Sequence, residues 1–307
     1  MSERGRSGAQ SSLPASSDNA LLVLGGGGML GGAVIEAARA RGISCAGRDR
    51  QALDLRNTPT LERTLDAVRP AAVINCAAFT DVDACEQRIE DAMEVNGRAV
   101  GRLARAVSAR GAVLFQVSTD YVFRGDADRA YREDDETGPI SVYGQSKLLG
   151  ERLALDSGAA VVVRTSWLFG PRSRNFVDTI LRAARSGGSL RVVDDQIGGP
   201  TYAPFLADAL VELAELTLSG SPPRPPGVLH YRNDEPVSWY GLARAVLETW
   251  GIDAEVEPVS TEEFPRPARR PAYSVLSVER FERLTGRAVR HWREALLDYR
   301  AREEVVA

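Results

Sequence analysis

Short apolar runs alternate with longer mixed segments along the first half of the chain. Runs of this kind are typical of strands that are buried on both faces of a parallel sheet. The mixed segments are long enough to be helices. Strands are predicted at residues 20–24, 43–46, 72–75, 112–117 and 159–163, and helices at 29–41, in the segment ending near 110, and at 142–155. The alternation predicts an α/β fold, a doubly wound parallel sheet of the Rossmann type.

The second half of the chain has a less regular pattern. Helices are predicted at residues 175–186, 204–218 and 239–250, and residues 228–231 could return to the sheet as a strand. Four prolines within residues 219–227 cannot sustain a helix and predict a linker or surface loop. Residues 265–271 are predicted to be extended and to precede short helices. The predicted organisation is a disordered head at 1–18, a dinucleotide-binding Rossmann domain at 19–165, and a smaller, interleaved region at 166–307 that mainly binds substrate and returns some segments to the sheet.

A glycine-rich loop separates the first predicted strand from the first predicted helix. It contains the spacing Gly-x-x-Gly-x-x-Gly. Glycine lets the backbone turn tightly and approach a pyrophosphate, which then lies at the positive end of the helix. The alternative is a flexible turn that holds no ligand, and the flanking strand and helix favour the nucleotide site. The predicted cofactor-binding residues of this loop are Gly25, Gly27, Gly28, Met29, Leu30 and Gly31.

The residues after the second predicted strand bear on the choice of cofactor. An acidic residue at this place favours NAD, whereas an arginine can pair with the 2′-phosphate of NADP. Arg48 occupies it and predicts NADPH, against the alternative of a surface charge. Asp49 follows and could reach the ribose hydroxyls, so NADH stays open as a second cofactor.

Two further segments are placed to border the cofactor. Asp54 and Leu55 follow the second strand and could lie beside the adenine. Asn75-Cys-Ala-Ala78 ends the third strand, and its small residues, Ala77 and Ala78, would let a cofactor lie across the strand tips.

The chain contains 37 arginines and one lysine, Lys147, which lies four residues after Tyr143. A tyrosine and a lysine at this spacing share one face of a helix. An ammonium near a phenol favours phenolate and lowers the phenol pKa, which makes the tyrosine a proton donor or acceptor near neutrality. A chance placement of the one lysine at this position is the less favoured alternative.

A third polar group is predicted at the same edge of the sheet. Thr119 closes the fourth strand at its carboxyl end, where ligands bind in such folds. Its hydroxyl could hydrogen-bond a carbonyl oxygen whose negative charge grows as hydride arrives. A hydroxyl residue by itself is more often a cap or turn residue, but Tyr143 and Lys147 downstream favour a catalytic role.

Composition excludes several other classes of protein. The net charge of −4 gives no general attraction for nucleic acid or for an anionic membrane. Three cysteines without metal-ligand spacing and two histidines argue against a zinc site, so no metal ligands are assigned, and they fit a reducing cytoplasm. No apolar stretch approaches the length of a membrane span. With 44% hydrophobic and 26% charged residues, the chain is predicted to be globular and cytoplasmic.

These motifs together resemble an extended short-chain dehydrogenase/reductase, and more closely the dTDP-4-dehydrorhamnose reductase family. The resemblance covers roughly residues 20–295 and is far more specific as a set than any one motif. The residues that carry it are 25–31, 75–83 with Glu86, 95–96, 118–123, 143–147 with Gly150 and Glu151, 164–167, 195–201, 238–240 and 269–271.

The resemblance implies NADPH-dependent reduction of the 4-keto group of a dTDP-linked 6-deoxyhexose, such as dTDP-4-dehydro-L-rhamnose. It implies that Tyr143 gives the proton, that Lys147 holds the nicotinamide ribose and tunes Tyr143, and that Thr119 orients the carbonyl. Substrate contacts are implied for Val82, Asn96, Thr119, Asp120 and Trp167. Cofactor contacts are implied for Gly27, Gly28, Met29, Asp54, Leu55, Ala78, Phe79 and Thr80.

The chain also departs from the family pattern. Leu24 stands where many relatives have threonine, and Arg124 stands where an acidic residue is common, which leaves the sugar preference open. Some relatives bind magnesium at a dimer contact, so a homodimer and a Mg²⁺ ion are considered, although no ligands can be mapped here. An NAD-retaining epimerase or dehydratase and a non-catalytic regulatory subunit are the alternatives, and the complete Thr119, Tyr143 and Lys147 set favours the reductase.

Overall fold

The computed structural model of the protein describes residues 20–219 and 227–306. The predicted head at 1–18 and most of the predicted loop at 219–227 lie outside the described residues. None of the described helices combines the length and apolarity that a membrane span needs.

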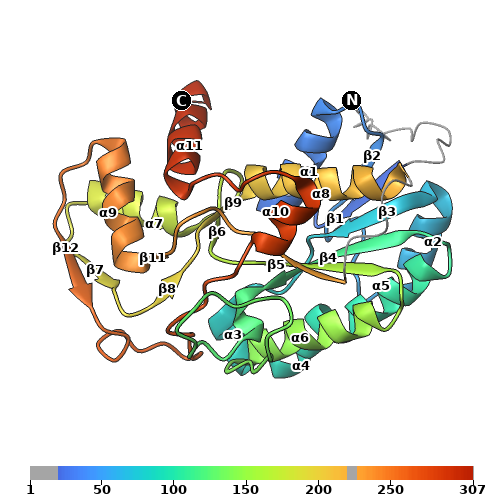
Figure 1. The fold of residues 1–307 in the computed structure, drawn as a ribbon, viewed down its shortest axis with the longest axis horizontal. Coiled ribbons are helices and arrows are strands. Elements are labelled where there is room, and N and C mark those ends of the chain that lie inside the picture. Colours follow the sequence, from blue (N-terminus) through green and yellow to red (C-terminus); the bar gives the residue numbers. More distant parts are fainter. Residues whose placement is uncertain (1–19, 220–226, 307) are drawn as a thin grey trace, which may run out of the picture.

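A six-stranded parallel sheet forms the centre of the molecule, in the order β10-β5-β4-β3-β1-β2 (Figure 1). The predicted fold class is confirmed. The chain runs outward from β1 to β2 and then returns to place β3 on the other side of β1. A crevice for ligands is expected at the carboxyl ends of β1 and β3, because the strand order reverses there. The strands are β1 (Ala20–Leu24), β2 (Cys45–Arg48), β3 (Pro70–Asn75), β4 (Val113–Thr119), β5 (Ala160–Thr165) and β10 (Val228–His230).

Helices cover both faces of the sheet, which is why its strands are apolar on both sides. One face is covered by α1 (Met29–Ala40) and α8 (Ala203–Leu218), which pack against each other. The other face carries α2 (Thr58–Val68), α5 (Ala99–Ser108) and α6 (Val142–Leu155) (Figure 1). In β1, Leu21 and Val23 join the α1–α8 core, whereas Leu22 and Leu24 join the α2–α5 core.

A smaller group of elements lies beside the sheet (Figure 1). β7 pairs with β12 in parallel, β8 pairs with β11 in antiparallel, and β6 pairs with β9 in parallel. Although α8 and β10 come after residue 166, they belong to the layers of the large sheet. The elements of the smaller group are β6 (Leu168–Phe169), α7 (Phe176–Arg185), β7 (Leu190–Val193), β8 (Ile197–Gly198), β9 (Thr201–Tyr202), β11 (Val237–Ser238), α9 (Trp239–Trp250), β12 (Val256–Val259) and α11 (Trp292–Val306). The short helix α10 (Glu279–Thr285) packs instead against β10 of the large sheet.

Three sequence predictions need correction. The second strand begins two residues later than predicted, because Gly42, with φ of 70°, closes α1 and the Ile43 amide bonds back to Ala38. The segment predicted as one helix ending near 110 is divided into α3 (Val82–Gln87), α4 (Ile89–Ala92), a π-helix η1 (Met93–Arg98) and α5. The C-terminal helices are not all short, since α11 has 15 residues.

Candidate active site

The glycine loop lies at the point where the strand order reverses, and its backbone is in contact with the end of β3. Gly25 has φ of 76°, and a Cβ built on it would lie 2.8 Å from the Ala77 amide nitrogen. A Cβ on Gly31 would lie 2.2 Å from the Gly25 carbonyl oxygen. Neither position accepts a side chain, so these glycines are needed for the close approach of loop, helix and strand. The predicted loop residues therefore lie together beside Ala77.

The first turn of α1 is suited to an anion. Gly28 is the N-cap residue, and no side chain of the described chain caps this helix. Its first amide groups are therefore left for a ligand, and the helix dipole adds positive potential. A pyrophosphate satisfies both features. The residues present thus fit a dinucleotide with its pyrophosphate at Gly28, Met29 and Leu30.

Arg48 and Asp49 lie directly beside this loop. The Gly26 amide donates to the Arg48 carbonyl at 2.9 Å, and the Arg48 guanidinium donates to the Gly47 carbonyl at 2.8 Å. Within residues 20–219 and 227–306, Arg48 has no ion-pair partner. Asp49 accepts a bond from the Ala52 amide at 2.8 Å, so its carboxylate caps its own turn and does not hold Arg48. Arg48 is left available to a phosphate at the end of β2.

Asp54 and Leu55, which are predicted to lie beside the adenine of the cofactor, follow the second strand. A hydrogen-bonded ion pair with Arg56 holds the pKa of Asp54 at about 2, so its carboxylate is ionised at neutral pH. Leu55 is buried in the α2–α5 core. At the end of β3, the Asn75 side chain accepts a bond from the Ala77 amide and donates one to Gln116, which fixes the strand tip.

Asn96 holds the segment that includes Phe79. Its Oδ1 accepts from the Phe79 amide at 2.8 Å, and its Nδ2 donates to the Phe79 carbonyl at 2.9 Å and to the Ser146 hydroxyl at 3.0 Å. The residue is 1% exposed. Its amide is fully engaged with protein groups, which disagrees with the direct substrate contact implied by the resemblance. We infer instead that Asn96 positions residues 78–80 against α6.

The predicted triad is brought together at the end of β4. The Thr119 hydroxyl donates to an Asp120 carboxylate oxygen at 3.0 Å, and both residues lie near enough to the Tyr143 phenol to affect its pKa. Tyr143 lies in the first turn of α6, which Ser141 caps through the Gly144 amide. A Cβ on Gly144 would lie 2.2 Å from the Tyr121 carbonyl oxygen, so a glycine there lets α6 approach the end of β4. Lys147 lies one turn later and donates from Nζ to the Val117 carbonyl at 2.7 Å.

The protonation of Tyr143 differs from the sequence prediction. Burial raises the pKa of its phenol, the nearby Thr119 hydroxyl opposes this rise, and the nearby Asp120 charge adds to it. The prediction that Lys147 lowers this pKa is wrong, because the ammonium is directed to the Val117 carbonyl and the pKa is raised. Burial lowers the pKa of Lys147 itself to about 8. At neutral pH the phenol is therefore protonated and ready to act as an acid.

The buried ion pair of Glu151 and Arg164 lies behind Lys147. Arg164 donates from Nε to Glu151 at 3.0 Å and from its terminal nitrogen at 2.7 Å, and both side chains are almost fully buried. The Glu151 carboxylate opposes the fall in the Lys147 pKa. Sequence analysis assigned no role to either residue. The sequence feature that could have indicated a role for Glu151 is its i+4 spacing from Lys147.

Asp120 and Val82 stand at the same edge of the sheet. Asp120 is buried, and burial raises the pKa of its carboxyl to about 6, although the Thr119 hydroxyl donates to one of its oxygens at 3.0 Å. Val82 is half-buried and begins α3, which Asp81 caps. The next residue, Asp83, accepts bonds from Arg266 and Arg270, so the predicted extended segment crosses from the smaller group of elements to α3.

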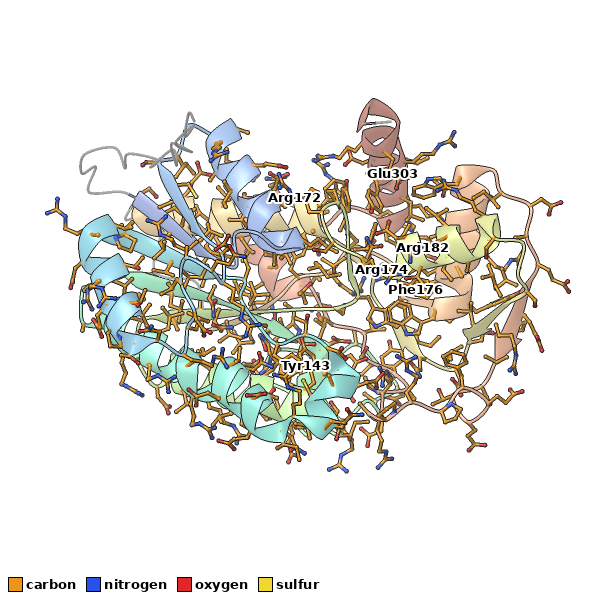
Figure 2. All side chains as sticks on the ribbon, turned by 180° about the vertical axis from the view of Figure 1, so that it is seen from behind. Tyr143, Arg172, Arg174, Phe176, Arg182 and Glu303 are labelled. Carbon is orange, nitrogen blue, oxygen red and sulfur yellow. The ribbon has the colours of Figure 1, made fainter. Side chains whose placement is uncertain are left out.

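Trp167 stacks on Trp239, an aromatic residue to which the sequence analysis assigned no role. The two indole rings have centroids 3.5 Å apart and planes at 6°. Phe176, at the start of α7 (Figure 2), packs against Trp239 with ring centroids 4.6 Å apart. Trp167 has φ of 45°, a strained value for this residue type that is concentrated at functional sites. A Cβ on Gly198 would lie 2.4 Å from the indole, so only glycine leaves room for it.

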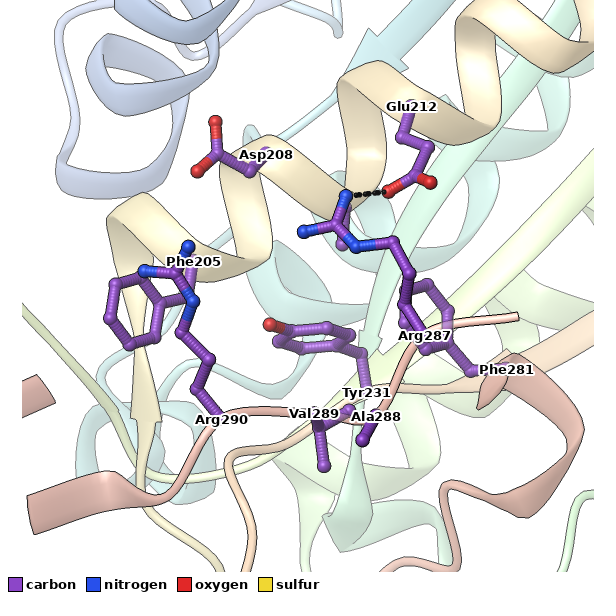
Figure 3. A pocket seen from close by; sticks show the side chains of 10 residues that line it. Phe205, Asp208, Glu212, Tyr231, Phe281, Arg287, Ala288, Val289 and Arg290 are labelled. Atoms are coloured by element: carbon purple, nitrogen blue, oxygen red, sulfur yellow. Dashed lines mark hydrogen bonds and ion pairs between the residues drawn. The ribbon is translucent and has the colours of Figure 1, made fainter. Parts of the chain in front are cut away.

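A small hollow near α8 lies away from these residues (Figure 3). Arg287 pairs with Glu212 at 2.9 Å across it, and the Arg290 guanidinium lies over the Phe205 ring. Its volume of about 30 Å³ has room for about two water molecules, not for a sugar nucleotide. Among the described residues, no group of three or more His, Cys, Asp or Glu side chains is arranged to hold a metal ion.

The parallel sheet, the glycine loop at its switch point and the Tyr143–Lys147 pair under the strand tips define a short-chain dehydrogenase/reductase of the extended type. Residues 19–304 match the family described as RmlD substrate binding domain. The chain belongs to this family, that of the dTDP-4-dehydrorhamnose reductases.

Individual relatives match over nearly the whole chain. The dTDP-4-dehydrorhamnose reductase of Streptomyces griseus is 41% identical over 280 residues, which cover 90% of this chain and 91% of that enzyme. The crystal structure of a dTDP-4-dehydrorhamnose reductase from Clostridium acetobutylicum superposes with a TM-score of 0.87 at 36% identity and covers 93% of this chain and 99% of that one. The Bacillus anthracis reductase in complex with NADP gives a TM-score of 0.87 at 32% identity, covering 92% and 99%.

Proposed function

We propose that the protein reduces the 4-keto group of a dTDP-linked 6-deoxyhexose with NADPH, converting dTDP-4-dehydro-L-rhamnose to dTDP-L-rhamnose or a close analogue. The observation that carries this proposal is the placement of the Thr119 hydroxyl close to a protonated Tyr143 phenol, at the carboxyl edge of the sheet that also carries the glycine loop. The names of its relatives and the NADP complex of one of them support the same activity.

The chain's own residues provide the proton and the charge stabilisation. When bound, the nicotinamide supplies a hydride to sugar carbon 4. The Tyr143 phenol gives its proton to the oxygen that becomes negative, and the Thr119 hydroxyl hydrogen-bonds the same oxygen. The Lys147 ammonium lies one turn along α6 and holds the nicotinamide ribose. Trp167 and Asp120 contact the sugar.

The decisive experiment is incubation with dTDP-4-dehydro-L-rhamnose and NADPH. We expect loss of nicotinamide absorbance and formation of the 4-hydroxy sugar, identified by its NMR spectrum. The same assay with the UDP-linked sugar tests the nucleotide. Absence of cofactor oxidation with any dTDP-4-keto-6-deoxyhexose would refute the proposed reaction.

Arg48→Ala is expected to remove a preference for NADPH over NADH. Arg48 can pair with the 2′-phosphate through charge-assisted bonds, which predicts a wild-type preference of about tenfold to hundredfold. The measurement is kcat/KM for NADPH and NADH in both proteins. Arg50→Ala, two residues later and exposed, is the control and should retain the preference. Equal use of the two cofactors by the wild type would show that Arg48 is a surface charge.

Trp167→Ala is expected to raise the KM for the sugar nucleotide by about tenfold, because a large aromatic contact that orients the sugar is lost. The stack with Trp239 is lost as well, so a lower melting temperature is also expected. Trp167→Phe retains a stacked ring and should restore most of the stability. A fall in melting temperature with an unchanged KM would assign Trp167 to the core alone.

We infer a cytoplasmic enzyme from the free cysteines. The proposed homodimer is tested by light scattering of the purified chain, with and without Mg²⁺.

A further inference from the structure

The loop between β6 and α7 crosses to the cofactor helix. Arg172, in this loop, has φ of 79°, a left-handed value that is rare for residues with a side chain. Its side chain lies against Gly32 in the first part of α1, where a Cβ would be 2.7 Å from Arg172 Cδ. Its guanidinium forms an ion pair with Glu36. Because residue 32 is a glycine, the arginine side chain has room to lie directly against α1.

The face of α1 that Arg172 contacts extends to the N-terminus of the helix, where an anion is expected to bind. Gly28, Gly32 and Glu36 are spaced by four residues, so they follow one face of α1. Arg172 rests on this face at Gly32, one helical turn (about 5.4 Å) from the N-cap residue Gly28. Figure 2 shows it beside α1, on the side from which α7 begins. The reach of an arginine side chain spans such a step.

The ion pair with Glu36 is weakly held. The two side chains are 47% and 48% exposed, and exposed pairs of this kind contribute little stability. A pyrophosphate at the first turn of α1 carries more negative charge than one carboxylate and accepts two parallel bonds from a guanidinium. A dinucleotide bound there would therefore compete with Glu36 for Arg172.

We propose that Arg172 is a cofactor-binding residue, which leaves Glu36 and pairs with the pyrophosphate of NADP(H) when the cofactor binds. Glu36 holds the arginine next to its site in the free protein. The inference rests on the proposed use of a dinucleotide. Because NADPH and NADH have the same pyrophosphate, Arg172 contributes equally to both, whereas Arg48 discriminates between them.

Binding of cofactor without sugar tests the proposal. Titrations of NADPH and NADH, followed by nicotinamide fluorescence, should give a Kd raised about tenfold for both cofactors in Arg172→Ala, with an unchanged ratio between them. Glu36→Gln frees the arginine and should lower both values about two- to fivefold. In the Arg172→Ala background, Glu36→Gln should have no effect. Arg39→Ala, on the last turn of α1, controls for net charge and should leave binding unchanged.

Two outcomes overturn the inference. Unchanged binding of both cofactors by Arg172→Ala would make the ion pair a simple anchor of the loop to α1. A raised Kd for dTDP, with unchanged cofactor binding, would assign Arg172 to the diphosphate of the sugar nucleotide. A wild-type protein that binds neither cofactor would instead refute the proposed function. Failure of the proposed function can therefore be told apart from failure of the role proposed for Arg172. Because Glu36→Gln is expected to improve binding, misfolding cannot produce the predicted pair of results.

Discussion

Tyr143→Phe is expected to reduce turnover by about 10²–10⁴-fold while NADPH binding is retained. The substitution removes the phenol hydroxyl but keeps the half-buried ring at the end of β4. Raised by burial, the pKa of this phenol keeps it protonated at neutral pH, so the wild type provides an acid where the alkoxide forms. Steady-state turnover and a fluorescence titration of NADPH measure the two effects separately.

Tyr231→Phe is the matched control. Tyr231 is a buried tyrosine that lines the hollow of Figure 3, away from the triad, and packs edge-on against Phe281. Turnover should be unchanged in this variant. Near-normal turnover in Tyr143→Phe would show that Tyr143 is not the proton donor.

Lys147→Arg is expected to reduce kcat/KM by about a hundredfold although the positive charge is kept. Lys147 is 4% exposed, and its Nζ donates to the Val117 carbonyl at 2.7 Å. A guanidinium is a planar fork that cannot occupy this point-charge site without moving Tyr143 or the ribose, and displacements of about 1 Å cost about that factor. Arg152→Lys, on the exposed side of α6, is the control and should leave kcat/KM unchanged.

The pH dependence gives a second test of Lys147. Burial lowers its pKa to about 8, so the ammonium is present below this pH and is lost as the pH rises through it. The kcat/KM for NADPH, which reports the free enzyme, should therefore fall above about pH 8 in the wild type. The residual activity of Lys147→Arg should show no such fall, since the guanidinium stays charged. The same alkaline limb in both proteins would assign it to another group.

Much of the fold could be predicted because its local signals are strong. The helix at 142–155 was predicted with the bounds that the structure shows, since Ser141 caps it and its residues sustain a helix throughout. Alternation of short apolar runs and helices is enough to predict a parallel sheet, because both faces must be covered. The glycine loop was located because a tight turn between a strand and a helix depends on residues adjacent in sequence.

Features of the site that depend on residues far apart in the sequence could not be predicted. The Tyr143 pKa is set by burial under packed segments, and Lys147, its neighbour in sequence, is turned toward β4 instead. Asn96 is committed to Phe79 and Ser146, and the arginine of the β6–α7 loop lies on a helix that begins more than a hundred residues earlier in the chain.

The sequence by itself determined which residue types stand at the strand ends and helix starts of this protein, because backbone propensities and periodicity act over a few residues. Only the tertiary structure decided which side chains are buried, which charges are paired and which aromatic rings stack, as Trp167 does on Trp239. Burial and pairing arise from contacts between distant segments, and these contacts set the pKa values and the orientation of the reacting groups.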